Sequence, residues 1–269
     1  MTATKIAILG CSGRMGRLLV ETGRADPDCR VVAGVEGPGS KALGQDLGAL
    51  AGGSPLGLAV TEDARAAFAL ADVAIDFTVP AASLAHAALA AESGTALVIG
   101  TTGLSAGQLE TIGAAAARAP ILRAANVSLG VTLLLALVEQ AAVRLPAADY
   151  DIEILEMHHR HKVDAPSGTA LALGEAAAAG RGVSLEEASV RVRDGHTGPR
   201  EAGTIGFATL RGGDVAGDHS VIFAAEGERL ELGHRASNRA VFAKGAIRAA
   251  KWLAGRPNGL YAMKDVLGL

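Results

Sequence analysis

Short apolar runs alternate with helical patterns through the first half of the chain. The segments Lys5–Leu9 and Arg30–Val35 are short and apolar, which is typical of strands buried inside a parallel sheet. The helix predicted between them is marked by side chains at helical spacing, namely Met15, Leu18, Leu19 and Thr22.

The same alternation continues further along the chain. Apolar runs predict strands over Val73–Phe77, Ala96–Gly100 and Ile121–Ala125. Pro80 can open a helix over Ala81–Glu92, because proline is favoured in the first turn of a helix.

A second helix start is predicted from a capping box. Ser105 and Gln108 have the required spacing for a helix over Leu109–Arg118. Alternating strands and helices predict a doubly wound parallel sheet, in which ligands bind at the carboxyl ends of the strands.

The second half is predicted to be mostly sheet. Partial alternation in Tyr150–Met157 predicts a strand, and Ser167 can cap a helix over Ala170–Ala179. A long helix that Ser237 could cap extends through Trp252 and can return to the first domain. Further strands are predicted over Ser189–Arg193, Gly203–Arg211, Asp218–Ala225 and Arg229–Arg235, the last two as a hairpin.

This pattern predicts two domains, one of residues 1–127 with 237–269 and one of residues 128–236. The 269 residues suffice for both, and 49% hydrophobic with 20% charged residues is ordinary for a globular protein. A net charge of −3 gives no bulk electrostatic reason to bind nucleic acid or an anionic membrane. Any anion site therefore has to be local.

Cysteine content and hydropathy bear on the compartment. Cys11 and Cys29 are too few for a disulfide framework, and we expect reduced thiols. The N-terminus lacks the apolar core of a secretion signal. The most apolar later stretch, Val127–Leu137, is too short to span a bilayer. We expect a soluble cytoplasmic protein.

The glycine loop GCSGRMG follows the first predicted strand. Gly10 would allow a tight turn, Gly13 a close approach of a pyrophosphate to backbone N–H groups, and Gly16 close packing of helix and strand. Glu36 ends the second strand, 20 positions after Gly16, where an acid can hydrogen-bond the ribose of the adenosine. These features together predict a dinucleotide site, although a glycine turn in a nucleotide-free domain remains an alternative.

Other segments lie at predicted strand ends, where one cofactor could contact them all. They have structural alternatives, because Thr101 and Thr102 can satisfy a turn and Asn126 can cap a helix over Ser128–Leu145. The segments are Asp76-Phe77, Gly100–Thr102 and Ala124–Val127.

Positive charge is concentrated in EMHHRHKVDAPSGT, residues 156–169. The order HHRHK interleaves Arg160 and Lys162 with histidines, which disfavours a metal site because both side chains repel a cation. A solvated basic loop is a second alternative. An anionic pocket fits better, because Arg and Lys pair with carboxylates, a histidine can donate a proton, and free N–H groups at Gly168-Thr169 can bind an anion. A dinucleotide beside such a pocket suggests reduction of a carboxylate-bearing substrate.

With these motifs the sequence resembles the dihydrodipicolinate reductases of bacterial and plant lysine biosynthesis. The resemblance implies an α/β Rossmann dinucleotide-binding domain plus an α+β substrate and tetramerisation domain with a mixed sheet. It also implies a cytoplasmic homotetramer that reduces 4-hydroxy-tetrahydrodipicolinate, by way of dihydrodipicolinate, to tetrahydrodipicolinate with NADH or NADPH. The matching stretches are GCSGRMG, DFT, GTTG, AANVSLGV, E-x-HHRHK-x-DAPSGTA, GHTG and GTIGFA.

The resemblance also assigns roles to residues. It implies that His158 is the proton donor, that Lys162 is the second catalytic residue, and that His159 contacts the substrate. Gly168 and Thr169 would hold a carboxylate, whereas Arg160 would have a supporting role. The implied cofactor contacts are Gly10, Cys11, Ser12, Gly13, Arg14, Met15, Glu36, Gly100, Thr101, Thr102, Ala124, Ala125, Asn126 and Val127, with no metal site.

Three positions depart from the family pattern. Gly37 stands where members that use NADPH well often have arginine, and Val79 replaces another frequent arginine. Because a bare Glu36 should repel a 2′-phosphate, we expect a preference for NADH, although Arg14 could partly restore NADPH binding. Val127 replaces an aromatic residue, which predicts a changed nicotinamide contact without loss of activity.

Two other functions remain in view. One is a different oxidoreductase on the same architecture, such as an amino-acid or semialdehyde dehydrogenase, against which the HHRHK block argues. The other is a dinucleotide-sensing regulator without catalysis, in which replacement of His158 would change nothing.

Overall fold

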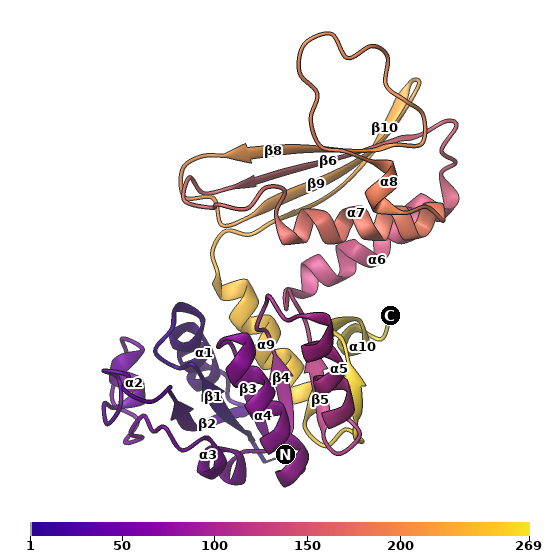
Figure 1. The fold of residues 1–269 in the computed structure, drawn as a ribbon. Coiled ribbons are helices and arrows are strands. Elements are labelled where there is room, and N and C mark those ends of the chain that lie inside the picture. Colours follow the sequence, from indigo (N-terminus) through magenta and orange to yellow (C-terminus); the bar gives the residue numbers. More distant parts are fainter. Residues whose placement is uncertain (1) are drawn as a thin grey trace. The chain divides into compact units, whose positions relative to one another are not determined.

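The structure is a computed structural model that describes residues 2–269 (Figure 1). Its contacts divide the chain into two compact units. The first unit runs to Ser128 and takes up the chain again over Ala240–Leu269, and the second is Leu129–Arg239. Which unit binds cofactor and which binds substrate stays a prediction at this point.

The first unit contains a six-stranded sheet in the order β11-β5-β4-β3-β1-β2. Every neighbouring pair is parallel, which confirms the predicted parallel sheet. Its inner strands β3, β4 and β5 are short and almost wholly buried, because helices cover both faces of such a sheet, whereas the edge strand β11 is only partly buried. The strands are β1 (Thr4–Leu9), β2 (Cys29–Val35), β3 (Val73–Asp76), β4 (Ala96–Ile99), β5 (Pro120–Arg123) and β11 (Gly259–Tyr261).

Two helices of this unit, α4 and α5, begin where the sequence gives a start signal. Pro80 is the first residue of α4, and the capping box of Ser105 and Gln108 at α5 is present in both directions. Within the unit α9 packs beside α1, and α4 packs between α3 and α5. The helices are α1 (Arg14–Ala25), α2 (Leu47–Leu50), α3 (Ala64–Leu70), α4 (Pro80–Ser93), α5 (Ala106–Ala115), α9 (Ala240–Leu253) and α10 (Met263–Leu267).

The second unit contains a five-stranded mixed sheet in the order β10-β9-β6-β8-β7. β6 is parallel to β8 and antiparallel to β9, and the predicted β9–β10 hairpin is present. Ser167 caps α7 by accepting a hydrogen bond from the Ala170 N–H. The elements are α6 (Leu129–Arg144), β6 (Asp151–His158), α7 (Gly168–Arg181), α8 (Leu185–Ala188), β7 (Ser189–Val190), β8 (Ile205–Arg211), β9 (Asp218–Ala225) and β10 (Glu228–Arg235).

β6 is the central strand of this second sheet, and its alternation decides which side chains enter the site. Ile152, Ile154, Glu156 and His158 point to the buried face, where α6 and α7 pack. The interleaved positions, such as Leu155, lie on the opposite face and are more exposed. The same strand therefore carries core residues at its start and polar site residues at its end.

Several predicted elements differ from the structure. The helix expected over Leu109–Arg118 runs over Ala106–Ala115, directly after its cap at Ser105. The strand expected over Ser189–Arg193 pairs only at Ser189–Val190, because Arg193 turns instead to the carboxylate of Glu153. The helix expected from Ser237 begins at Ala240. Short elements without an amphipathic pattern, including α2, α3 and β11, have no counterpart in the sequence-based expectation.

Candidate functional site

The glycine loop after β1 has the tight geometry that its sequence predicts. Gly10 has a φ of 75°, a conformation that favours glycine. A Cβ on Gly16 would lie 2.1 Å from the Gly10 carbonyl oxygen, so only glycine lets α1 start this close to the turn. Gly13 caps α1 without a side-chain hydrogen bond, and both Gly13 and Arg14 are exposed. The start of α1 is therefore compact and accessible, as a pyrophosphate cradle requires.

Glu36 faces this loop from the end of β2. Its Oε1 accepts a hydrogen bond of 2.6 Å from the Ser12 N–H. The space around Gly37 is open, since a Cβ there would have no neighbour within 4 Å. The carboxylate is thus fixed beside the loop and has no cationic side chain next to it in sequence.

The other predicted strand-end segments meet at the same edge of the sheet. Backbone hydrogen bonds join Phe77 N to Leu9 O, Gly100 N to Asp76 O, and Ala124 N to Ile99 O. Because parallel strands end at one edge, the residues expected to contact the cofactor are brought together there. Gly100 has a structural role as well, since a Cβ would lie 2.3 Å from the ring of Phe77.

Asp76 is the polar centre of this edge. Its wholly buried carboxylate accepts hydrogen bonds from the Thr78 N–H and hydroxyl at 2.9 and 2.6 Å and from the Thr101 hydroxyl at 3.3 Å. It also lies 3.0 Å from Nδ1 of His86 on α4. Thr101 thus satisfies a turn, which was the structural alternative for it, whereas Thr102 is exposed. Asn126 accepts from the Ser128 N–H at 2.9 Å, just before α6.

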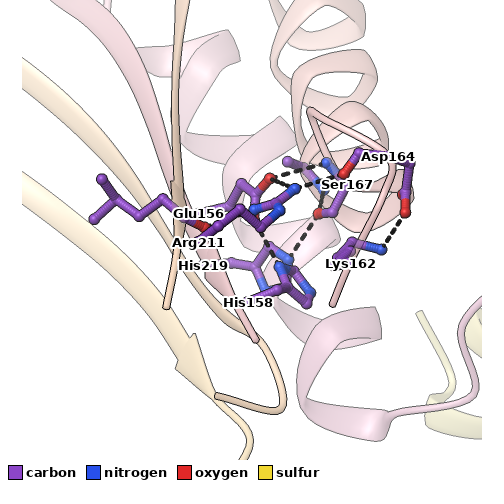
Figure 2. Close-up of polar contacts among 9 residues, drawn as sticks. Glu156, His158, Lys162, Asp164, Ser167, Arg211 and His219 are labelled. Atoms are coloured by element: carbon purple, nitrogen blue, oxygen red, sulfur yellow. Dashed lines mark hydrogen bonds and ion pairs between the residues drawn. The ribbon is translucent and has the colours of Figure 1, made fainter. Parts of the chain in front are cut away.

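In the second unit the end of β6 carries a buried histidine–carboxylate pair. His158 Nδ1 lies 2.6 Å from Glu156 Oε2. Arg211 on β8 binds both oxygens of Glu156 at 2.9 Å, and the Ser167 N–H donates to Oε1 at 3.1 Å. Figure 2 shows these side chains converging on Glu156 from β6, β8 and the start of α7. Burial alone would raise the pKa of Glu156, but the hydrogen bonds from Arg211 and His158 outweigh it and hold this pKa below its usual range.

His219 on β9 completes the buried side of this cluster. Its Nε2 lies 3.1 Å from the Ser167 hydroxyl, and its ring packs edge-on against His158 with centroids 5.1 Å apart. Burial, together with the neighbouring His158, lowers the pKa of His219 to about 4. The ring of His219 is therefore neutral near pH 7 and acts as a hydrogen-bonding support.

The remaining residues of the block line the loop between β6 and α7. Lys162 Nζ pairs with Asp164 Oδ1 at 2.8 Å. Desolvation lowers the pKa of His159, and nearby positive groups that include Lys162 lower it further. Gly168 and Thr169 form the first turn of α7, close to Ser167. The predicted proton donor His158, the lysine Lys162 and the predicted carboxylate-binding turn at Gly168-Thr169 are thus parts of one cluster.

Arg160 and His161 are both exposed, and the ring of His161 lies beside that of His159, with centroids 6.3 Å apart. Over residues 2–269 no group of three or more His, Cys, Asp or Glu side chains is placed to hold a metal ion. In the same range no helix is long and apolar enough to cross a membrane.

Arg211 and His219 were missed by the sequence reasoning, and so was His86. Strand register brings Arg211 and His219 into the cluster, because His158 pairs with Arg211 between β6 and β8 and Glu156 pairs with His219 between β6 and β9. A signal was available in GDHS, where a lone histidine follows a glycine turn at the start of a strand, but it does not reveal the partner.

The comparisons with known proteins cover both halves of the chain. Residues 4–127 match the family model "Dihydrodipicolinate reductase, N-terminus", and residues 130–267 match "Dihydrodipicolinate reductase, C-terminus". Two relatives named 4-hydroxy-tetrahydrodipicolinate reductase are similar over nearly their whole length. The one from Rhizobium rhizogenes is 57% identical and covers 99% of this chain and 97% of its own, and the one from Brucella melitensis is 56% identical and covers 98% of each.

A solved structure is similar as well. Dipicolinate-bound dihydrodipicolinate reductase from Paenisporosarcina sp. TG-14 superposes with a TM-score of 0.78 at 25% identity. The superposition covers 97% of this chain and 98% of that one.

Proposed function

The chain belongs to the dihydrodipicolinate reductase family, and we propose that it carries out that family's reaction with His158 as the proton donor. It is an NAD(P)H-dependent oxidoreductase. The reaction reduces 4-hydroxy-tetrahydrodipicolinate, by way of dihydrodipicolinate, to tetrahydrodipicolinate in the diaminopimelate route to lysine. The single observation that carries the role of His158 is its place at the end of β6, with Nδ1 held by Glu156.

The cofactor half of the proposal rests on the glycine loop and the strand ends of the first unit. The N–H groups at the start of α1 would hold the pyrophosphate, and Glu36 would accept the ribose hydroxyls. Gly100–Thr102 and Ala124–Val127 would lie along the nicotinamide half. The bound nicotinamide supplies the hydride, and the residues of this edge orient it.

The substrate half of the proposal rests on the cluster at β6 and α7. His158 would give a proton to the substrate ring from Nε2, and the ammonium of Lys162 would stabilise negative charge there. Gly168 and Thr169 would bind one carboxylate at the start of α7, and His159 would contact the substrate from the loop. A small dicarboxylate suits this cationic cluster, and the solved relative is named as dipicolinate-bound.

We propose NADH as the preferred cofactor. Glu36 carries a negative charge where a 2′-phosphate would sit, and Gly37 offers no cation to offset it. Arg14 is exposed in the loop and gives NADPH some residual binding.

We also propose a cytoplasmic homotetramer that associates through the sheet of the second unit, with no nucleic-acid or membrane partner. The uncovered face of this sheet supports the proposal, because it carries half-exposed apolar residues such as Leu155 and Leu210.

The test measures nicotinamide absorbance with substrate made freshly by a coupled synthase. Wild type should oxidise NADH only in the presence of the synthase product. His158→Gln should lower kcat by roughly 10²–10⁴-fold, the usual contribution of a general acid, and leave NADH affinity unchanged. Binding of NADH without any turnover by the wild type would instead favour the regulatory function.

A further inference from the structure

We propose that Glu156 and Arg211 act together as positioning residues, which fix the orientation of the proton donor and set how readily it releases its proton. The inference rests on the proposed role of His158 and deepens it. Neither residue needs to touch the substrate, since both act through the ring of His158.

All acceptor positions of the Glu156 carboxylate are in use. Oε2 accepts hydrogen bonds from His158 Nδ1 and from one N–H of Arg211. Oε1 accepts hydrogen bonds from a second N–H of Arg211 and from the backbone N–H of Ser167. An ionised carboxylate offers about four lone-pair sites, so this one is saturated. Its side chain is 1% exposed, and water cannot compete for these places.

This contact assigns the two nitrogens of His158 different tasks. Nδ1 donates to Glu156 and keeps its hydrogen, so Nε2 is the atom that gives a proton and later regains one from solvent. Gly217 keeps space beside Nε2, because a Cβ at this position would lie 3.0 Å from that atom. After the proton moves to the substrate ring as the hydride arrives, a neutral imidazole with its Nδ1–H intact remains.

The guanidinium of Arg211 balances the negative charge of the Glu156 carboxylate. A carboxylate 2.6 Å from an imidazole favours the protonated ring and would retain its proton. Arg211 neutralises that carboxylate through two hydrogen bonds and also contacts the Asp164 carbonyl, so it is itself held in place. The pair gives His158 a fixed acceptor without a full unbalanced negative charge.

Other groups around His158 also determine the charge near its ring. His219 on β9 is the nearest ring, and its pKa of about 4 leaves it neutral during turnover. Lys162 in the loop adds positive charge, which Asp164 offsets, whereas the lowered pKa of His159 favours its neutral form. The titratable and charged groups around His158 include Glu156 (β6), Arg211 (β8) through Glu156, His219 (β9) with His234 (β10) beside it, and the loop residues His159, Lys162 and Asp164.

The pH dependence of kcat separates this role from a merely structural one. Activity that needs a protonated donor falls as pH rises, and the midpoint of that fall is the quantity to follow. Glu156→Gln removes negative charge beside the ring and should move the midpoint to lower pH. Arg211→Met leaves the Glu156 charge unbalanced and should move it to higher pH. Each shift should be about 1 pH unit or more, and Glu156→Gln should also lower kcat about 10-fold or more.

A matched control lies on the same strand. The Glu153 carboxylate accepts two hydrogen bonds of 2.8 Å from Arg193 and a third from Arg200. It lies on the face of the sheet opposite to Glu156 and His158. Glu153→Gln should leave the midpoint where it is. Thermal unfolding and NADH titration show which variants are folded, and if Glu156→Gln is not, Arg211→Met compared with the charge-retaining Arg211→Lys still decides.

The outcomes are distinct. Opposite shifts in Glu156→Gln and Arg211→Met, with NADH affinity unchanged, support the inference. Wild-type turnover that depends on His158, with no shift or with shifts in one direction only, would overturn it and leave the proposed function standing. Absence of turnover in the wild type would overturn the proposed function itself.

Discussion

Charge at the ribose end of the cofactor site depends on two adjacent residues. Glu36 is fixed by the Ser12 N–H, and Gly37 has open space around it. The Cβ of an arginine at position 37 would meet no neighbour within 4 Å, and its guanidinium could pair with a 2′-phosphate. The preference for NADH should therefore be reversible by one substitution.

Gly37→Arg should raise the ratio of kcat/KM for NADPH over NADH by roughly 10–100-fold, the worth of one charge-assisted hydrogen bond. The wild-type ratio should lie below one. Gly37→Gln is the control, since it fills the same space without charge and should change the ratio little. An unchanged ratio in Gly37→Arg would mean that position 37 does not reach the adenosine phosphate.

Single residues differed in how far the sequence could predict them. Glu156 and His158 are two positions apart on one strand face, so the sequence already contains their proximity. Arg211 and His219 lie 55 and 63 positions after Glu156 in the sequence. Only the register of the sheet brings them next to Glu156 and His158. Register depends on how whole strands pair, and local spacing carries no information about it.

At the scale of elements, Asp76 ties β3 to the loop after β4 and to α4. Burial alone would raise its pKa, but hydrogen bonds from His86 and Thr78 outweigh this and hold the pKa below the ordinary 3.8. Because the folded-state pKa is the lower one, this stabilisation is complete above the unfolded-state value. It is lost as pH falls through the folded-state value.

Asp76→Asn should lower the free energy of unfolding by about 1.5–3 kcal/mol at pH 7, since buried charged hydrogen bonds are weakened. The difference from wild type should shrink toward pH 3, and NADH should bind more weakly because Thr101 loses its anchor. Urea titrations at both pH values measure this. Asp72→Asn, whose exposed carboxylate accepts from the Lys5 N–H, should cost less than about 1 kcal/mol at either pH.

The loop between β7 and β8 is held by one side chain in particular. Arg200 binds the carboxylates of Asp151 and Glu153 at 2.7 and 2.9 Å and the carbonyls of Ile152 and Thr204 at 3.0 and 2.7 Å. These contacts hold an otherwise exposed segment against the start of β6.

Arg200→Ala should make this loop open more often and speed its cleavage by trypsin at the remaining arginines by roughly 10-fold or more. Arg191→Ala, an exposed change in the same loop, should leave cleavage elsewhere in the loop at the wild-type rate. Equal cleavage of Arg200→Ala and wild type would show that other contacts hold the segment.

Elements with a start signal or a clear period were predictable, and short ones were not. The capping box at Ser105 and the cap at Ser167 are local, so the sequence shows them. β11 has only three residues and is a strand because it pairs with β5. β7 ends at Val190, shortly before Arg193 binds the Glu153 carboxylate. Tertiary partners decide such elements, and the local pattern cannot.

For the whole molecule, the alternation of strands and helices predicted the parallel sheet, and the family resemblance supplied the mixed one. What the pattern could not give is how one sheet face is left without a covering helix. In the second unit α6 and α7 pack on the face of Ile152 and Ile154, while Leu155 and Leu210 on the other face are 36% and 47% exposed. Exposed apolar residues on adjacent strands are typical of an interface between subunits.

Leu155→Glu should therefore dissociate the proposed tetramer, because it places a charge in the middle of that face, beside Ala208 on β8. Analytical ultracentrifugation at equal concentration should give about one quarter or one half of the wild-type mass, with thermal unfolding confirming a folded protein. Leu70→Glu replaces a leucine that is 58% exposed on α3 of the first unit, and it should leave the mass unchanged. A tetramer that persists in Leu155→Glu would mean that the subunits associate through another surface, and the open sheet face would then need a different explanation.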